Sequence, residues 1–295
     1  MRGFFWNQIG GILDYGLFLV FSVLIARALG AKEFGLYGTV VSYAAFGLML
    51  ISLGMDRAIH VFVPTFEQAE RKSVSLVRRF FQIRLTMGLA VAAILFLASP
   101  LLMAAMGQPR VGGLLRWMGV YVISMGLSSL FLAFFSAKLE LKKARLTKAA
   151  IQVINVAGAL WIFRFGGGVG AVLVLLSATV MLTALAFGWM SRDVFSGPRE
   201  RADLGEIRSF CGSQTVMEVL SFITGKNADI ILLNLLLAGT LQAGYYNISA
   251  ALTLAISTML ISGAGDIALS ATSMMVQKGE PDQLHRAWRF RIKAS

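Results

Sequence analysis

The segment SQTVMEVLSFITGKNADIILLNLLL, residues 213–237, is long and apolar enough to cross a lipid bilayer. The charged side chains of Lys226 and Asp229 nevertheless lie near its middle. A charge at that depth costs roughly 2.5–3.5 kcal/mol or more, so it normally faces a protein interior or a water-filled path. The segment therefore predicts a membrane helix whose charged side is turned away from lipid.

The composition of the whole chain agrees with a membrane protein. Hydrophobic residues make up 57% of the 295 and charged residues only 14%, and the mean hydropathy is +0.73. A soluble domain averages about 25% charged residues, so it could not hide this much apolar surface. The net charge of +12 would suggest nucleic acid in a soluble protein, but here the basic residues cluster between apolar runs. We therefore expect no nucleic-acid partner.

Eight apolar runs have the length of a membrane-spanning helix. They cover residues 8–29, 35–55, 80–105, 113–137, 146–165, 168–190, 213–237 and 242–264. The fifth and sixth are separated only by glycines 166–168, which predict a tight turn. The predicted fold class is an all-α polytopic membrane protein with about eight transmembrane helices.

The basic residues predict the orientation of these helices. With residue 1 in the cytoplasm, the segments on the outer side hold only Arg27, Lys32, Arg110, Arg116 and Arg164. Apart from Lys226, all other lysines and arginines then fall at cytoplasmic ends, as the positive-inside rule requires. Both termini are predicted to be cytoplasmic.

The chain also shows an internal repeat with an offset of 209 residues. This offset places Gly30 on Gly239, Gly35 on Gly244 and Tyr37 on Tyr246, and further pairs run from Gly54 with Gly263 to Arg84 with Lys293. Duplicated helical units are common in transporters. The repeat predicts a six-helix lobe over residues 1–192, a cytoplasmic linker over 193–212, and the first two helices of a related lobe over 213–295. We interpret the sequence as a transporter truncated before its ninth helix.

Three motifs carry a resemblance to a known family. Residues 26–37, ARALGAKEFGLY, resemble a signature of bacterial polysaccharide flippases, as do residues 54–57, GMDR, and 243–251, AGYYNISAA. These proteins export O-antigen and exopolysaccharide repeat units and belong to the multidrug/oligosaccharidyl-lipid/polysaccharide superfamily. The resemblance implies two lobes around a central cavity that opens alternately to either side of the bacterial plasma membrane.

A flippase of this kind would move an anionic diphosphate with polar sugars, so basic residues inside the membrane are candidate ligands. Lys226 is the first candidate, with Asn227 and Asn234 on or next to the same side of the helix. Asp229 completes the set, and its spacing from Lys226 also allows a structural ion pair within one helix.

Two further candidates lie in other helices. Asp14 lies about two turns inside the first helix, where it could bind a coupling cation or pair with a basic residue of a neighbouring helix. Arg57 ends the second helix, where it could receive the diphosphate or simply lie beside anionic lipid. We expect no cofactor, leaving coupling to H⁺ or Na⁺ open.

The favoured function is translocation of polyprenyl-diphosphate-linked oligosaccharides, with membrane lipids and the polysaccharide polymerase machinery as partners. One alternative is a cation-coupled drug or metabolite exporter. Another, from a different class, is a membrane scaffold or a glycosyl-lipid polymerase subunit, although a polymerase should show a large outer loop. The sequence contains no arrangement of residues that indicates a catalytic or metal site, so we expect no enzyme.

Overall fold

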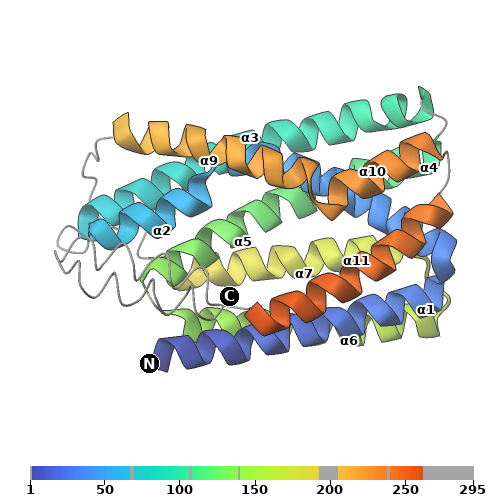
Figure 1. Ribbon diagram of the computed structural model, residues 1–295, viewed down its shortest axis with the longest axis horizontal. Helices are drawn as coiled ribbons and strands as arrows, with labels where there is room; N and C mark the ends of the chain where they lie inside the picture. Colours follow the sequence, from blue (N-terminus) through green and yellow to red (C-terminus); the bar gives the residue numbers. More distant parts are fainter. Residues whose placement is uncertain are drawn as a thin grey trace.

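The structure is a computed structural model that describes residues 2–66, 70–105, 108–138, 140–192, 205–237 and 240–261. These residues are almost entirely helical, and the helices run roughly along one common axis (Figure 1). The prediction of an all-α polytopic membrane protein is confirmed.

The helices follow the predicted apolar runs closely. Their bounds are α1 Arg2–Ser52, α2 Met55–Thr65, α3 Glu70–Ala105, α4 Pro109–Leu115, the 3₁₀ turn η1 Arg116–Met118, α5 Gly119–Ala137, α6 Leu141–Arg164, α7 Val169–Met190, α9 Gly205–Ile223, α10 Lys226–Leu236 and α11 Thr240–Ile261. Each run lies in one of these helices or in a short series of them, as far as the described residues extend. Residues 205–212 of the predicted linker form the first turns of α9, and 193–204 lie outside the described residues.

Helix α1 consists of two arms, because the chain reverses at Gly30. The backbone of Gly30 is non-helical, with φ 74° and ψ 168°, a conformation that glycine adopts without strain. The first arm, residues 2–29, runs from the N-terminus to this turn, and the second arm, residues 31–52, returns alongside the bundle toward α2 (Figure 1). We call the two ends of the bundle the Gly30 end and the α2 end.

The described residues contain five helical spans long and apolar enough to cross a membrane, and the bent pair α9–α10 is a sixth candidate. The first span, Gly16–Ser52, includes the reversal at Gly30, so it covers parts of two predicted crossings. Helix α11 is not among the spans over its described residues. These two facts account for the difference from the eight crossings predicted.

The surface of the bundle fits a lipid environment. Large apolar side chains of α6 and α7 are exposed, among them Trp161 at 67%, Leu185 at 62% and Trp189 at 72%. Inside, α2, α3, α5 and α9 share a buried apolar cluster that includes Ile59, Val77 and other aliphatic and aromatic side chains. Water would disfavour the exposed set, whereas acyl chains would cover it.

The tight turn between the fifth and sixth predicted helices is confirmed. Helix α6 ends at Arg164 and α7 begins at Val169. Gly166 has φ 73°, and the N–H of Gly167 donates to the carbonyl oxygen of Ile162 at 2.8 Å. Glycine therefore closes the carboxyl end of α6 in the left-handed conformation that such helix ends favour.

The second arm of α1 crosses α11 with its backbone in direct contact, and the contact obeys the repeat. A Cβ on Gly35 would overlap the carbonyl oxygen of Thr240, and a Cβ on Gly244 would overlap that of Ala31. Thr240 and Gly244 lie 209 residues after Ala31 and Gly35, so the second arm of α1 and α11 make the same contact reciprocally. Small residues allow helices in membranes to approach this closely.

The glycine crossing leads to a test of packing. Gly35→Ala should lower the unfolding temperature of the purified chain in detergent, because the added methyl group forces the two backbones apart at a cost of about 1–3 kcal/mol. Gly212→Ala is the matched control, since a Cβ there meets no atom within 4 Å. Equal melting of both variants, followed by circular dichroism, would contradict the close crossing.

Candidate functional site

The predicted helix 213–237 is broken in the middle, which is a correction to the sequence analysis. Helix α9 ends at Ile223, α10 begins at Lys226, and their axes differ by 49°. Gly225 is extended, with φ −98° and ψ 161°, and a Cβ there would lie 2.7 Å from the carbonyl oxygen of Ser221. The hydroxyl of Thr224 donates to the carbonyl oxygen of Leu220 at 2.9 Å. This local bonding and the small glycine favour a break that apolar periodicity does not reveal.

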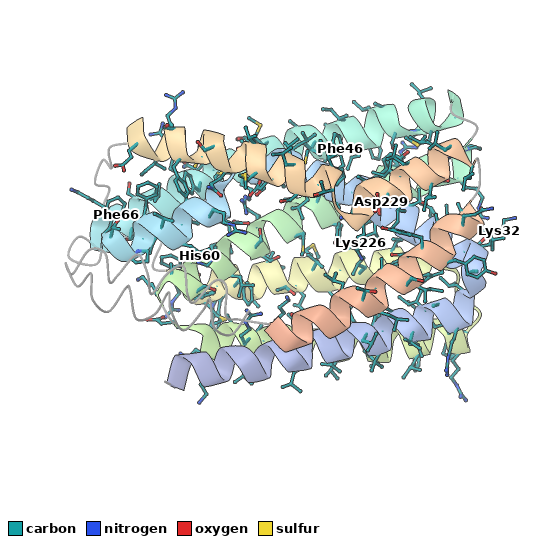
Figure 2. The ribbon with its side chains drawn as sticks, viewed as in Figure 1. Lys32, Phe46, His60, Phe66, Lys226 and Asp229 are labelled. Atoms are coloured by element: carbon teal, nitrogen blue, oxygen red, sulfur yellow. The ribbon has the colours of Figure 1, made fainter. Side chains whose placement is uncertain are left out.

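The break places Lys226 at the first position of α10 and not in the middle of a continuous helix. Its side chain is half-buried, and the described residues offer its ammonium no hydrogen bond or ion pair. Figure 2 shows Lys226 at the junction of α9 and α10, beside Asp229. A lysine at a helix N-terminus opposes the helix dipole, so this position is unfavourable for the charge.

Asn227 and Asp229 connect the first turn of α10 to the neighbouring helices. Ser42 of the second arm of α1 donates its hydroxyl to Asn227 Oδ1 at 3.2 Å. The hydroxyl of Tyr246 in α11 donates to a carboxylate oxygen of Asp229. The ion pair between Lys226 and Asp229 that the spacing allowed is therefore replaced by a hydrogen bond from Tyr246, and the ammonium of Lys226 is left available.

Asn234 does not join this cluster. It is 1% exposed, and its amide donates to Gln108 Oε1 at 2.7 Å, while Gln108 Nε2 donates to the backbone oxygen of Asn234 at 3.1 Å. This reciprocal pair fixes the end of α10 to the residue that precedes α4. Asn234 is thus a packing residue in this structure.

Asp14 and Arg57 also lie away from Lys226. Asp14, in the first arm of α1, is buried and forms an ion pair with Lys148 of α6 at 2.5 Å. Of the two roles considered for Asp14, cation binding and an ion pair with a basic residue of a neighbouring helix, the structure shows the ion pair. Arg57 is exposed near the start of α2. The predicted site residues that the structure brings together are therefore Lys226, Asn227 and Asp229.

Comparisons with known proteins agree with this architecture. The family model described as "Polysaccharide biosynthesis protein" matches residues 24–291. The chain belongs to this family. The resemblance drawn from the sequence motifs is confirmed.

The fold of this chain also resembles a solved structure. It is similar to the eukaryotic MATE transporter AtDTX14 with a TM-score of 0.70 and 13% identity, over 97% of this chain and 67% of that one. At that identity the likeness shows the fold alone. No curated protein sequence matches the chain.

The structure also reveals a buried arginine that the sequence analysis assigned to a cytoplasmic end. Arg84 is 1% exposed inside α3, where its guanidinium pairs with Asp56 at 2.8 Å. It also donates to the backbone oxygens of Gly126 and Ser52, at 2.7 and 3.1 Å, and to Ser129 Oγ at 2.9 Å. The signal was present, because Arg84 falls inside the apolar run 80–105 and an ionisable residue there is functional or structural by default.

Glu218 of α9 is the second residue that the sequence analysis missed. Its two carboxylate oxygens accept from Ser52 Oγ at 3.0 Å and from the N–H of Gly54 at 3.3 Å. Gly54 has φ 68°, and a Cβ on it would lie 2.6 Å from Gln214 Cβ and 2.7 Å from the carbonyl oxygen of Cys211. The turn between α1 and α2, part of the family-like motif 54–57, therefore docks α9 and joins Glu218 to Arg84 through Ser52.

The Arg84 network leads to a stability test in this family member. Arg84→Met should destabilise the chain by about 3–5 kcal/mol, because Asp56 would keep its charge without a partner. The double variant Arg84→Met/Asp56→Asn should recover part of that loss. Arg79→Met is the control, since Arg79 is exposed in the same helix. Thermal unfolding in detergent measures the effect, and a melting curve of Arg84→Met equal to that of Arg79→Met would disprove it.

Proposed function

We propose that this chain translocates polyprenyl-diphosphate-linked oligosaccharides across the bacterial plasma membrane by alternating access. The family match concerns polysaccharide biosynthesis, and the fold is similar to that of a solved MATE transporter. Both support the proposal. The observation that carries the proposal is the available ammonium of Lys226 at a helix break inside the membrane region.

The break supplies more than one group for an anion. The first backbone N–H groups of a helix have no partner within that helix and carry partial positive charge. In other transporters, the N-termini of broken helices point at anionic groups of the substrate near the middle of the membrane. Lys226 adds a full positive charge at that position, so a diphosphate is the best-matched ligand.

Asn227 and Asp229 would position this site and not bind the phosphate themselves. Their hydrogen bonds to Ser42 and Tyr246 hold α10 against the second arm of α1 and against α11. These two helices make the reciprocal glycine crossing. We propose that the crossing lies between the two lobes, residues 1–192 and 213–295, which would move relative to each other during transport.

The cation-coupled drug exporter is a weaker alternative. A positively charged site disfavours cationic drugs by several kcal/mol at short range, whereas it favours a diphosphate. Coupling to H⁺ or Na⁺ would suit Asp229, whose partner is a neutral hydroxyl, better than Asp14, which Lys148 already neutralises. A polymerase that consumes the exported units is the partner class that this function requires.

The charge of Lys226 leads to a test of transport. Lys226→Met should slow translocation of a fluorescent polyprenyl-diphosphate oligosaccharide in proteoliposomes by about ten- to a hundredfold, the loss expected for one hydrogen bond to a charged group. Lys226→Arg should retain most of the activity. Lys32→Met, at the exposed outer turn, is the control. Normal transport by Lys226→Met at wild-type expression would remove the proposal.

The orientation leads to a test of topology. Reporter fusions after Gly166 and after Leu241 should both report the outer side of the plasma membrane, because both positions follow helices that run from the α2 end to the Gly30 end (Figure 1). The excess of basic residues at the α2 end supports a cytoplasmic position for that end. A cytoplasmic signal at either position would contradict this orientation.

A further inference from the structure

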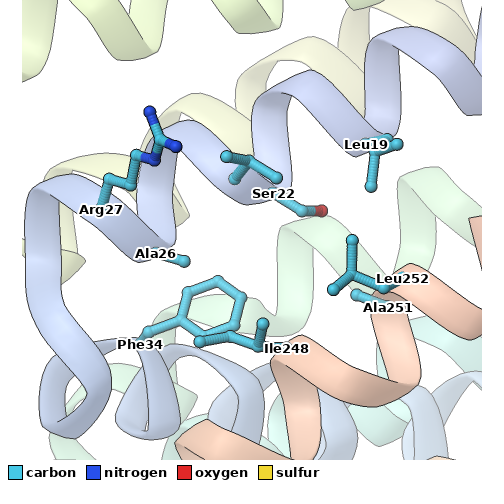
Figure 3. A pocket seen from close by; sticks show the side chains of 9 residues that line it. Leu19, Ser22, Ala26, Arg27, Phe34, Ile248, Ala251 and Leu252 are labelled. Carbon is cyan, nitrogen blue, oxygen red and sulfur yellow. The ribbon is translucent and has the colours of Figure 1, made fainter.

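A small apolar cavity lies where the two arms of α1 meet α11 (Figure 3). Its volume is about 240 Å³, and its walls come from Leu19, Phe34, Ile248, Leu252 and other apolar residues, with Ser22 and Arg27 as the two polar ones. Pockets for whole drug-sized ligands run from about 300 to 1,000 Å³. A sugar would lose its hydrogen bonds in such a cavity, so its chemistry suits a segment of hydrocarbon chain.

Arg27 places a positive charge at the mouth of this cavity. Its guanidinium points away from Ile248 and Leu252 in Figure 3, and the residue is exposed. The described residues give Arg27 no ion pair, because the nearby Glu33 is held by Arg110 through two hydrogen bonds of 2.8 and 3.0 Å. An arginine at the membrane interface can bury its aliphatic part in lipid while its unpaired guanidinium binds a phosphate.

The combination of an apolar cavity with a nearby arginine occurs in only one of the two halves of the internal repeat. The residues 209 positions after Ala26 and Arg27 are Leu235 and Leu236. The other half of the repeat therefore has bulkier side chains and no cation at the equivalent place. A general affinity of the bundle for lipid would not require this difference.

We propose that the cavity seats the phosphate-proximal part of the polyprenyl chain, with Arg27 bound to the phosphate, at the Gly30 end of the protein. The inference rests on the proposed function, which supplies the lipid. The cavity and the Lys226 cluster share α11: Tyr246 faces Asp229, whereas Ile248 and Leu252 face the cavity. Residues two apart lie on nearly opposite sides of a helix, so the cavity is a second station, distinct from the Lys226 site.

A photocrosslinking experiment tests this station. The probe is a polyprenyl phosphate that carries a diazirine on its first isoprene units, added to the full chain in vesicles of phosphatidylethanolamine and phosphatidylglycerol. Crosslinks should fall in residues 19–34 and 248–252. Ala26→Trp should reduce them at least about tenfold, because the indole displaces several buried methylene groups. Ala28→Trp, at an exposed position on the same arm, should not.

Separate controls test the charge of Arg27 and whether the bound hydrocarbon chain belongs to polyprenyl phosphate or to a phospholipid. Arg27→Gln should weaken labelling severalfold, whereas Lys32→Gln should leave it unchanged. Unlabelled polyprenyl phosphate should compete, and excess phosphatidylglycerol should not. Equal competition by phosphatidylglycerol would show that the cavity holds ordinary acyl chains and would overturn the inference, as would labelling that Ala26→Trp leaves intact.

Lys226→Met separates this inference from the proposed function. Its crosslinking to the cavity should equal that of the wild type even though translocation is slowed, because the two sites lie on different sides of α11. A chain that transports the oligosaccharide but is not labelled in the cavity overturns the second station alone. If the wild-type protein is labelled in the cavity but translocates no oligosaccharide, the proposed function alone is overturned.

Discussion

The cost of a charge in hydrocarbon governs the arrangement of the polar residues in this bundle. The hydrocarbon core contains no water to solvate a charge. A charged group at that depth therefore needs either a partner from another helix or a water-filled cavity. Arg84 is paired with Asp56 and Asp14 with Lys148, and Asp229 accepts a hydrogen bond from the hydroxyl of Tyr246. Lys226 receives no such partner from the described residues, and this difference is the reason for proposing Lys226, and not the paired residues, as a ligand site.

The apolar runs predicted the helices because length and hydropathy alone determine which segments cross a membrane. They could not predict the break at Thr224 and Gly225, since a hydropathy window averages over two residues whose local bonding ends one helix and starts another. Arg84 was visible as the one charge inside the run 80–105, and Glu218 as a third charge in the run 213–237, but their partners in other helices were not. Lys226 could be found from sequence as an anomaly, but its position at a helix N-terminus could not.

The repeat shows what sequence comparison within one chain can and cannot supply. The offset of 209 residues identified Gly35 and Gly244 as equivalent positions, yet equivalence does not imply contact. Only the structure shows that the two glycines lie at the crossing of their own helices and exchange the same contact. The partners of Asn234 and Asp14, Gln108 and Lys148, depend on how distant helices pack, so residue type and spacing did not reveal them.

The two ends of the bundle are held together by different physical means. At the Gly30 end, α1 and α11 meet through glycine backbones, a contact that depends on shape and has no charge to neutralise. At the α2 end, α9 is attached through the carboxylate of Glu218 to Ser52 and Gly54, and Arg84 reaches the same turn. A carboxylate that leaves its donors must find water or another partner, whereas glycine surfaces separate by losing only van der Waals contact. In a transporter that opens its ends in turn, opening at the α2 end would therefore require water or a ligand to replace the bonds of the charged Glu218. Opening at the Gly30 end would require only the neutral Gln108–Asn234 pair to be replaced and the space between α1 and α11 to be filled.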